Sequence, residues 1–137
     1  MIVIMCDGSS KGNPGPSSCG VIIWRRMKNR TRISRPTKRI NKKLGIMTNN
    51  QAEWYGVIVA MKYVISQKWQ DEEIYIYTDS QLVANQANLK WKIKHPQMKE
   101  LFNVWEQLIV SNHVKKWHVL WVPRQLIYLA DKEAGKA

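Results

Sequence analysis

The chain reads Asp7-Gly8-Ser9-Ser10-Lys11-Gly12-Asn13-Pro14-Gly15-Pro16 directly after an apolar run at residues 1–6. The run is rich in isoleucine and valine and ends in turn chemistry, so it predicts a short buried strand. Asp7 then stands at the exit of that strand, and the glycines beyond it carry no side chain. The stretch therefore predicts a site where a bulky partner can approach the end of a strand closely.

The rest of the chain alternates strand and helix signals around this start. We expect strands over residues 1–6, 19–27, 31–44, 74–78 and 116–122, with Pro36 at an edge or a bulge. We expect helices from Asn49 or Asn50 to about 67, over 80–88, from 96 to about 110, and from about 129. Three meandering strands followed by βα units predict an α/β fold, a five-stranded mixed sheet with helices on both faces. Residues 1–137 are expected to form one domain.

Two helices show which side chains should face the core. In the first, helical spacing predicts an inward face of Ala52, Tyr55, Gly56, Val59, Ala60 and Tyr63. In the helix that begins at Pro96, the same spacing predicts an inward face of Met98, Leu101, Phe102, Trp105 and Leu108.

The charge balance indicates a polyanionic partner. The chain has 22 lysines and arginines against 10 acids, a formal net charge of +12. Nucleic acid is the first candidate and an anionic membrane surface the second. No apolar run could span a bilayer and no signal peptide is recognisable, so we expect a cytoplasmic protein that is not bound to a membrane. We also expect a monomer. Cys6 and Cys19 make neither a disulfide framework nor a zinc site, and we expect two reduced, buried thiols.

Four acids occur in marked contexts: Asp7, Glu53 after Thr48-Asn49-Asn50-Gln51-Ala52, Asp79 at the end of the strand 74–78, and Asp131 in Leu129-Ala130-Asp131. Each one alone could be a turn residue, a helix cap or a first-turn acid. Together they predict a cluster, and a cluster of carboxylates repels itself unless it holds cations. Oxygen ligands favour Mg²⁺ or Mn²⁺, and two such ions about 3.5–4 Å apart can clamp a phosphodiester.

Four stretches, in this order, resemble the motifs of type 1 ribonuclease H. They are the opening stretch Asp7 to Pro16, Thr48-Asn49-Asn50-Gln51-Ala52-Glu53, Thr78-Asp79-Ser80-Gln81-Leu82-Val83, and Trp121-Val122-Pro123-Arg124 through Ala130-Asp131. The resemblance covers nearly the whole chain. It implies the ribonuclease H fold and hydrolysis of the RNA strand of RNA–DNA hybrids, leaving 5′-phosphate and 3′-hydroxyl ends.

The resemblance also implies roles for single residues. Asp7 would bridge two Mg²⁺ ions, with Mn²⁺ able to substitute. Asp131 would hold the ion that activates water, and Glu53 and Asp79 the ion near the leaving oxygen. Glu53 would also sense the ribose 2′-hydroxyl. The implied substrate contacts are backbone from Gly8, Ser9, Ser10 and Lys11 to the RNA, a DNA phosphate held by Thr48 and Asn49, and minor-groove contacts from Asn49, Asn50 and Gln81.

The chain also departs from the family. Many relatives carry a histidine in a glycine-rich loop before the last aspartate, whereas residues 123–131 contain neither residue type. The segment looks more like a compact subgroup with Val-Pro-Arg, although Tyr128 stands where that subgroup usually has asparagine. Arg124 could stabilise charge near the metal, or contact a phosphate, or form a surface ion pair. Ile46 stands where an arginine often completes the phosphate pocket, and His95, His113 and His118 are interpreted as surface residues.

These departures keep two alternative functions open. The first is a non-catalytic nucleic-acid-binding module on the same fold. The second is a nuclease that also cuts double-stranded RNA.

Two basic segments are candidate nucleic-acid contacts. Residues 25–43 hold ten basic residues and no acid, which favours sequence-independent phosphate contact. The sequence does not show whether this segment faces the substrate, a second nucleic acid or another partner. In Lys90-Trp91-Lys92-Ile93-Lys94, Trp91 could stack on sugar or base, or Trp91 and Ile93 could pack under the sheet with the lysines reaching to solvent.

Overall fold

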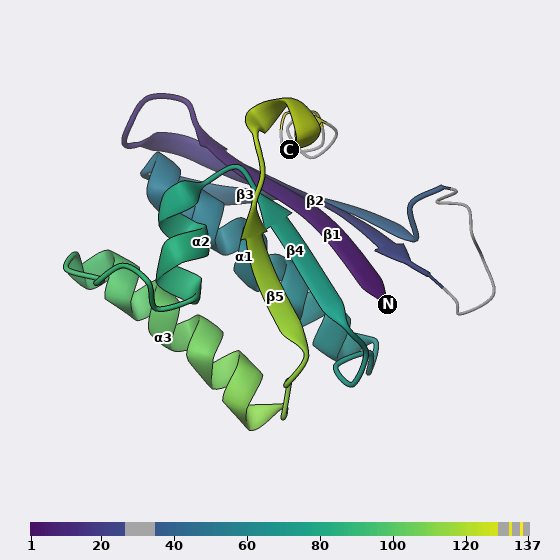
Figure 1. Ribbon diagram of the computed structural model, residues 1–137. Coiled ribbons are helices and arrows are strands. Elements are labelled where there is room, and N and C mark those ends of the chain that lie inside the picture. The colour runs from purple at the N-terminus through teal and green to yellow at the C-terminus, as the bar shows by residue number, and fades with distance from the viewer. Residues whose placement is uncertain (27–34, 129–131, 133–134, 136–137) are drawn as a thin grey trace.

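A computed structural model describes residues 1–26 and 35–128, together with 132 and 135 (Figure 1). Its elements, in chain order, are β1 (Ile2–Ser10), β2 (Gly15–Arg25), β3 (Lys38–Met47), α1 (Asn49–Ser66), β4 (Ile74–Thr78), α2 (Gln81–Ala87), α3 (Pro96–Ser111), β5 (Trp117–Trp121) and the 3₁₀ helix η1 (Arg124–Leu126). The final helix expected from about residue 129 lies outside the described residues.

The five strands form one mixed sheet in the order β3-β2-β1-β4-β5. The pairs β1/β2 and β2/β3 are antiparallel, whereas β1/β4 and β4/β5 are parallel. This confirms the predicted α/β mixed sheet. Because β1 and β4 are parallel neighbours at its centre, their carboxyl ends lie at the same edge (Figure 1).

Helices α1, α2 and α3 pack on one face of the sheet, and residues 122–127 pack on the other (Figure 1). On the α1 face the core contains Ile4, Val21 and Ile76 together with Trp54 of α1. Trp54 lies edge-on to Phe102 of α3, with ring centroids 6.3 Å apart. On the opposite face Ile22, Trp24 and Ile127 form a second buried cluster against Val3, Met5, Tyr77 and Val122. Within the described residues, α1, α2 and α3 therefore lie on one face, and the segment that contains η1 covers the other.

Strand β1 is longer than predicted. The sequence placed its end at Cys6, but pairing with β2 continues from Asp7↔Gly20 to Ser10↔Ser17. The turn chemistry after Asp7 belongs to the hairpin itself, so Asp7 lies inside the strand. Strand β2 accordingly starts at Gly15 and not at Cys19. Strand β3 was predicted over 31–44; within the described residues it begins at Lys38, just after Pro36, and runs on to Met47.

Helix α1 begins one residue away from the predicted cap. Thr48, and neither Asn49 nor Asn50, is the N-cap: its hydroxyl accepts from the Gln51 amide at 3.2 Å. In return, the Gln51 side-chain oxygen accepts from the Thr48 amide at 2.9 Å. This reciprocal capping box satisfies two amides that the first turn leaves without partners.

The buried surface of α1 is wider than predicted. Ala52, Gly56 and Ala60 are buried as expected, but the large fully buried side chains are Trp54, Ile58 and Met61. Tyr55, Val59 and Tyr63, which were predicted to point inward, are only partly buried. The reason is that α1 packs against β1 and β2 on one side and against α3 on another, so two of its sides are covered. In α3 the predicted Met98, Leu101 and Trp105 are buried, and Phe102 and Leu108 pack at the core margin.

Two further expectations concern the thiols and the membrane. Cys6 and Cys19 are both free and buried, as predicted. Among the described residues, no helix has the length and apolar character needed to cross a membrane.

Candidate active site

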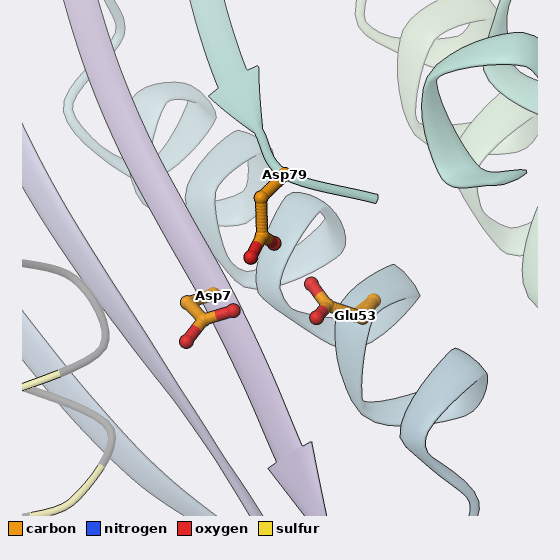
Figure 2. A group of neighbouring side chains, drawn as sticks. All are labelled: Asp7, Glu53 and Asp79. Atoms are coloured by element: carbon orange, nitrogen blue, oxygen red, sulfur yellow. The ribbon is translucent and has the colours of Figure 1, made fainter. Parts of the chain in front are cut away.

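Three carboxylates from distant parts of the sequence meet just beyond the last paired residues of β1 and β4, Met5 and Tyr77. Asp7 comes from β1, Glu53 from the start of α1, and Asp79 directly follows β4 (Figure 2). One oxygen of each lies within 4.8 Å of the others. The predicted cluster is therefore present for these three acids, while Asp131, the fourth, lies outside the described residues.

Close packing of α1 on β1 positions Glu53 beside Asp7. A Cβ on Gly8 would lie 2.2 Å from the backbone carbon of Ala52, so only glycine permits this approach. The Gly8 amide also donates to Glu53 Oε2 at 3.3 Å. The glycine after Asp7 thus both admits the helix and orients the acid that the helix carries.

Asp79 is held by its backbone. The Trp121 indole at the end of β5 donates to the Asp79 carbonyl oxygen at 3.1 Å. The next residue, Ser80, caps α2 by accepting from the Val83 amide at 3.1 Å. Sequence reasoning did not assign Trp121 a role at this site, although this residue opens the fourth motif.

The electrostatics of the cluster favour a bound cation. Burial, followed by the charges of Asp7 and Asp79, raises the pKa of Glu53 to about 10. Asp79 Oδ1 is buried and has no hydrogen-bond partner among the described residues. A bound cation would relieve the repulsion among these acids and give the buried oxygen of Asp79 a partner. Because all the ligand atoms are carboxylate oxygens, the cations that fit best are Mg²⁺ or Mn²⁺. Burial, followed by the charges of Glu53 and Asp7, also raises the pKa of the Cys6 thiol well above its ordinary value.

Arg124 lies beside the cluster. Its Nη1 lies 4.0 Å from Asp79 Oδ2, and its side chain is 71% exposed whereas that of Asp79 is 9% exposed. Arg124 is therefore at the mouth of the site, where it can reach an anionic substrate. Tyr128 is exposed.

The residues predicted to bind substrate lie on, or to either side of, the place where the β1–β2 turn is hydrogen-bonded to the start of α1, which we call the ridge. On the ridge, the Ser10 amide donates to Asn49 Oδ1 at 2.9 Å, and the Asn49 amide donates to Asn13 Oδ1 at 3.1 Å. These bonds tie the β1–β2 turn to the start of α1. Ser9 and Ser10 are half-buried, Lys11 is exposed, and Gln81 is exposed at the start of α2.

A cavity of about 400 Å³ opens on the α2 side of this ridge. Its lining residues are Asn13, Thr48, Asn50, Leu82, Gln86, Lys92, Lys94, His95 and Met98. Sequence reasoning missed Asn13 and His95, since neither stands beside an acid of the cluster.

Trp91 is exposed, whereas Ile93 packs against the core, so the predicted alternative in which both pack under the sheet is wrong for Trp91.

Comparisons with known proteins identify the family. The ribonuclease H family model matches residues 1–124. The bifunctional protein Rv2228c of Mycobacterium tuberculosis is 33% identical over 136 residues, which cover 99% of this chain and 35% of that protein. The chain thus spans about a third of the length of the first curated relatives it matches. Ribonuclease H of Enterobacter sp. (strain 638) is 30% identical over 131 residues, covering 88% of this chain and 76% of the relative.

Solved structures show the same architecture. LC11-RNase H1, crystallised in complex with an RNA/DNA hybrid, matches with a TM-score of 0.89 at 27% identity, covering 100% of this chain and 96% of that chain. RNase H1 from the halophilic archaeon Halobacterium salinarum matches with a TM-score of 0.84 at 26% identity, covering 99% of this chain and 96% of that chain.

Proposed function

The chain belongs to the ribonuclease H family, and on this premise we propose that it is a metal-dependent endoribonuclease that hydrolyses the RNA strand of RNA–DNA hybrids. The products would be 5′-phosphate and 3′-hydroxyl ends. The observation that carries the proposal is the meeting of Asp7, Glu53 and Asp79 within 4.8 Å on this fold. The hybrid bound by the similar LC11-RNase H1 supports the substrate class.

The metal would be Mg²⁺, with Mn²⁺ able to replace it, held as two ions by Asp7, Glu53, Asp79 and Asp131. Bound ions of this kind activate a water molecule and neutralise charge on the attacking and leaving oxygens of a phosphodiester. Asp7 would serve both ions, Asp131 the ion at the water, and Glu53 and Asp79 the ion at the leaving oxygen. The Gly8 amide would keep Glu53 aimed at the site through its hydrogen bond.

Other residues would bind and sort the substrate. The backbone of Gly8 to Lys11 would meet the RNA strand, and Glu53 would accept from a ribose 2′-hydroxyl, the group that DNA lacks. The cavity lined by Thr48 and Lys92 would hold a phosphate of the DNA strand. Asn49, Asn50, Gln81 and the exposed Trp91 would contact the hybrid nearby, and Arg124 would contact the phosphate at the mouth of the site.

The acidic cluster argues against a non-catalytic binding module. A protein that only binds a polyanion gains nothing from three clustered carboxylates, because these repel both one another and phosphate. Cleavage of double-stranded RNA, a monomeric state and a cytoplasmic location stay predictions from the sequence.

The test is cleavage of an end-labelled RNA–DNA hybrid with Mg²⁺ and then with Mn²⁺, beside the Asp7→Asn variant. We expect the RNA strand alone to be cut, and the variant to bind hybrid without cutting it. A folded protein that binds hybrid but cuts it with neither metal would favour the binding module. Double-stranded RNA assayed in parallel decides whether the substrate range is wider.

A further inference from the structure

A second cavity lies on the other side of the ridge, between the β1–β2 turn and β3, with a volume of about 420 Å³. Ser9, Ser18 and Lys43 line it, and the strand register places them in one row, Ser9 opposite Ser18 and Ser18 opposite Lys43. Side chains two residues apart on a strand share a face and are about 6.6 Å apart. The cavity therefore lies on the same face of the sheet as Asp7, one row further along β1.

The cavity carries positive charge. Lys11 from the turn and Lys43 from β3 both line it, and both side chains are exposed. Neither lysine forms an ion pair within the part of the chain that the structure describes, and none of the described lining residues is acidic. Two lysines beside serine hydroxyls, without a nearby acid, favour an anionic ligand.

Strand alternation sends the basic residues of β3 to opposite faces. Lys38 lies on the α1 face, with its Nζ 6.0 Å from the centre of the Tyr63 ring. Lys42 pairs with the buried Cys19 and shares the face of Lys38, whereas Lys43 faces the other way. The pairing skips Leu44, a bulge next to the cavity, and Gly45 has a φ of +80°. Bulges beside sites re-aim side chains, so Lys43 is the basic residue of β3 that the geometry directs into this cavity.

The two cavities flank the ridge formed by the Ser10–Asn49 and Asn49–Asn13 hydrogen bonds. A duplex also presents two rows of phosphates. The α2-side cavity is the one proposed above for the DNA strand. The Lys11–Lys43 cavity also contains Ile46, which stands in place of the phosphate-pocket arginine and supplies no charge; because this cavity lies on the face of Asp7, it is assigned to the strand that is cut. Resting on the proposed function, we propose that Lys11 and Lys43 form a subsite for a phosphate of the RNA strand, within a few nucleotides of the cleaved bond.

The first experiment measures hybrid binding in the Asp7→Asn background, so that it does not depend on cutting. Lys43→Gln and Lys11→Gln are compared with Lys42→Gln. This control also removes one positive charge, but from the residue directly before Lys43, whose side chain lies on the opposite face of β3. We expect a several-fold rise in Kd for the first two variants. We also expect each to reduce the slope of log K against log salt by about 0.7–0.9, the contribution of one phosphate contact. Equal behaviour of Lys43→Gln and Lys42→Gln would overturn the subsite.

The second experiment assigns the strand. Hybrids with a single uncharged methylphosphonate are scanned through the RNA strand and then through the DNA strand. We expect one RNA position near the scissile bond at which the neutral linkage weakens binding but causes no further loss with Lys43→Gln. Coupling to a DNA position instead would overturn the assignment. Because cleavage by the unsubstituted chain is scored separately, loss of the proposed activity and loss of the subsite are distinguishable.

Discussion

Two glycines in the interface between β1 and α1 differ in how much room they have. A Cβ on Gly8 would lie 2.2 Å from backbone atoms of Ala52, whereas a Cβ on Gly56 would lie 3.4 Å from the Cys6 Cβ. We expect Gly8→Ala to destabilise the fold by at least about 1–3 kcal/mol, because backbone must move to accommodate the methyl group. The same movement would displace Glu53 and reduce cleavage further than the loss of folded protein explains.

Gly56→Ala is the matched control for this prediction. Its methyl group meets an ordinary contact, and alanine favours a helix over glycine by about 1 kcal/mol. We therefore expect Gly56→Ala to be neutral or stabilising. Urea unfolding of both variants with kinetics on the folded fraction checks the pair, and a Gly8→Ala protein as stable and active as the parent would contradict the close packing.

The raised pKa of Glu53 predicts how stability depends on pH in the absence of metal. Burial and then the neighbouring Asp7 and Asp79 raise this pKa to about 10, against an ordinary value near 4.3 in the unfolded chain. Between these values the folded state holds a proton that the unfolded state has released. The contribution of Glu53 to the free energy of unfolding therefore falls as pH rises from about 4.3 towards 10.

Glu53→Gln tests this dependence, because the amide oxygen can still accept from the Gly8 amide but carries no charge. In EDTA, we expect the melting temperature of the parent to fall with pH more steeply than that of Glu53→Gln, and the variant to be the more stable protein at neutral pH. Parallel curves for the two proteins would show that Glu53 does not carry the raised pKa.

At the scale of elements, the capping box at Thr48 holds the start of α1, one turn before Glu53. Replacing an N-cap threonine by alanine costs about 1 kcal/mol, and we expect that loss for Thr48→Ala. Thr48 also lines the cavity proposed for the DNA phosphate, so the apparent Kd for hybrid should rise as well. Ser66→Ala, at the other end of α1, is the control, since its hydroxyl donates to the Tyr63 carbonyl within the same helix, at 2.6 Å. Denaturant unfolding and hybrid binding of the two variants separate the effects.

Local patterns predicted elements well where local forces decide them. Strand β4 has the predicted bounds because a short run of alternating isoleucine and tyrosine lies between polar residues, Glu72-Glu73 before it and Asp79-Ser80 after it. Strand β1 was predicted too short, since only the ladder with β2 shows that Asp7 to Ser10 remain extended. The α1 face was predicted too narrow because burial of Trp54 depends on α3, which follows more than forty residues later. Tertiary contacts, which a local pattern does not contain, account for both differences.

Across the whole molecule, the acids of the site were easier to predict from the sequence than the basic surface around them. Their flanking motifs marked Asp7, Glu53 and Asp79 individually, and the parallel β1/β4 pair brings two of them together. The basic segment at 25–43 looked like one patch. In the described part of this segment, strand register places Lys38 and Lys42 on one face of β3 and Lys43, which lines the Lys11 cavity, on the other. Composition alone contains no information on strand register.

In a chain with a net charge of +12, general screening and binding of a cation at a site both stabilise the folded state, but only site binding depends on which cation is present. Salt that screens repulsion among 22 basic side chains acts without a site, and it does so for any cation at matched ionic strength. Mg²⁺ or Mn²⁺ bound between Asp7, Glu53 and Asp79 stabilises only the folded state, by RT ln(1 + [L]/Kd), about 2.7 kcal/mol at a hundred times Kd. We expect a rise of several degrees in melting temperature with Mg²⁺ beyond that with K⁺ at equal ionic strength.

Asp7→Asn should reverse the order of stability. Without metal, the variant loses one repelling carboxylate and should melt above the parent. With saturating Mg²⁺ it should gain little, so that the parent overtakes it. Calorimetry of both proteins in EDTA, K⁺ and Mg²⁺ gives all the values needed. If Mg²⁺ and K⁺ raised the two melting temperatures equally, the ions would be acting on overall charge, and the three carboxylates would not form a metal site.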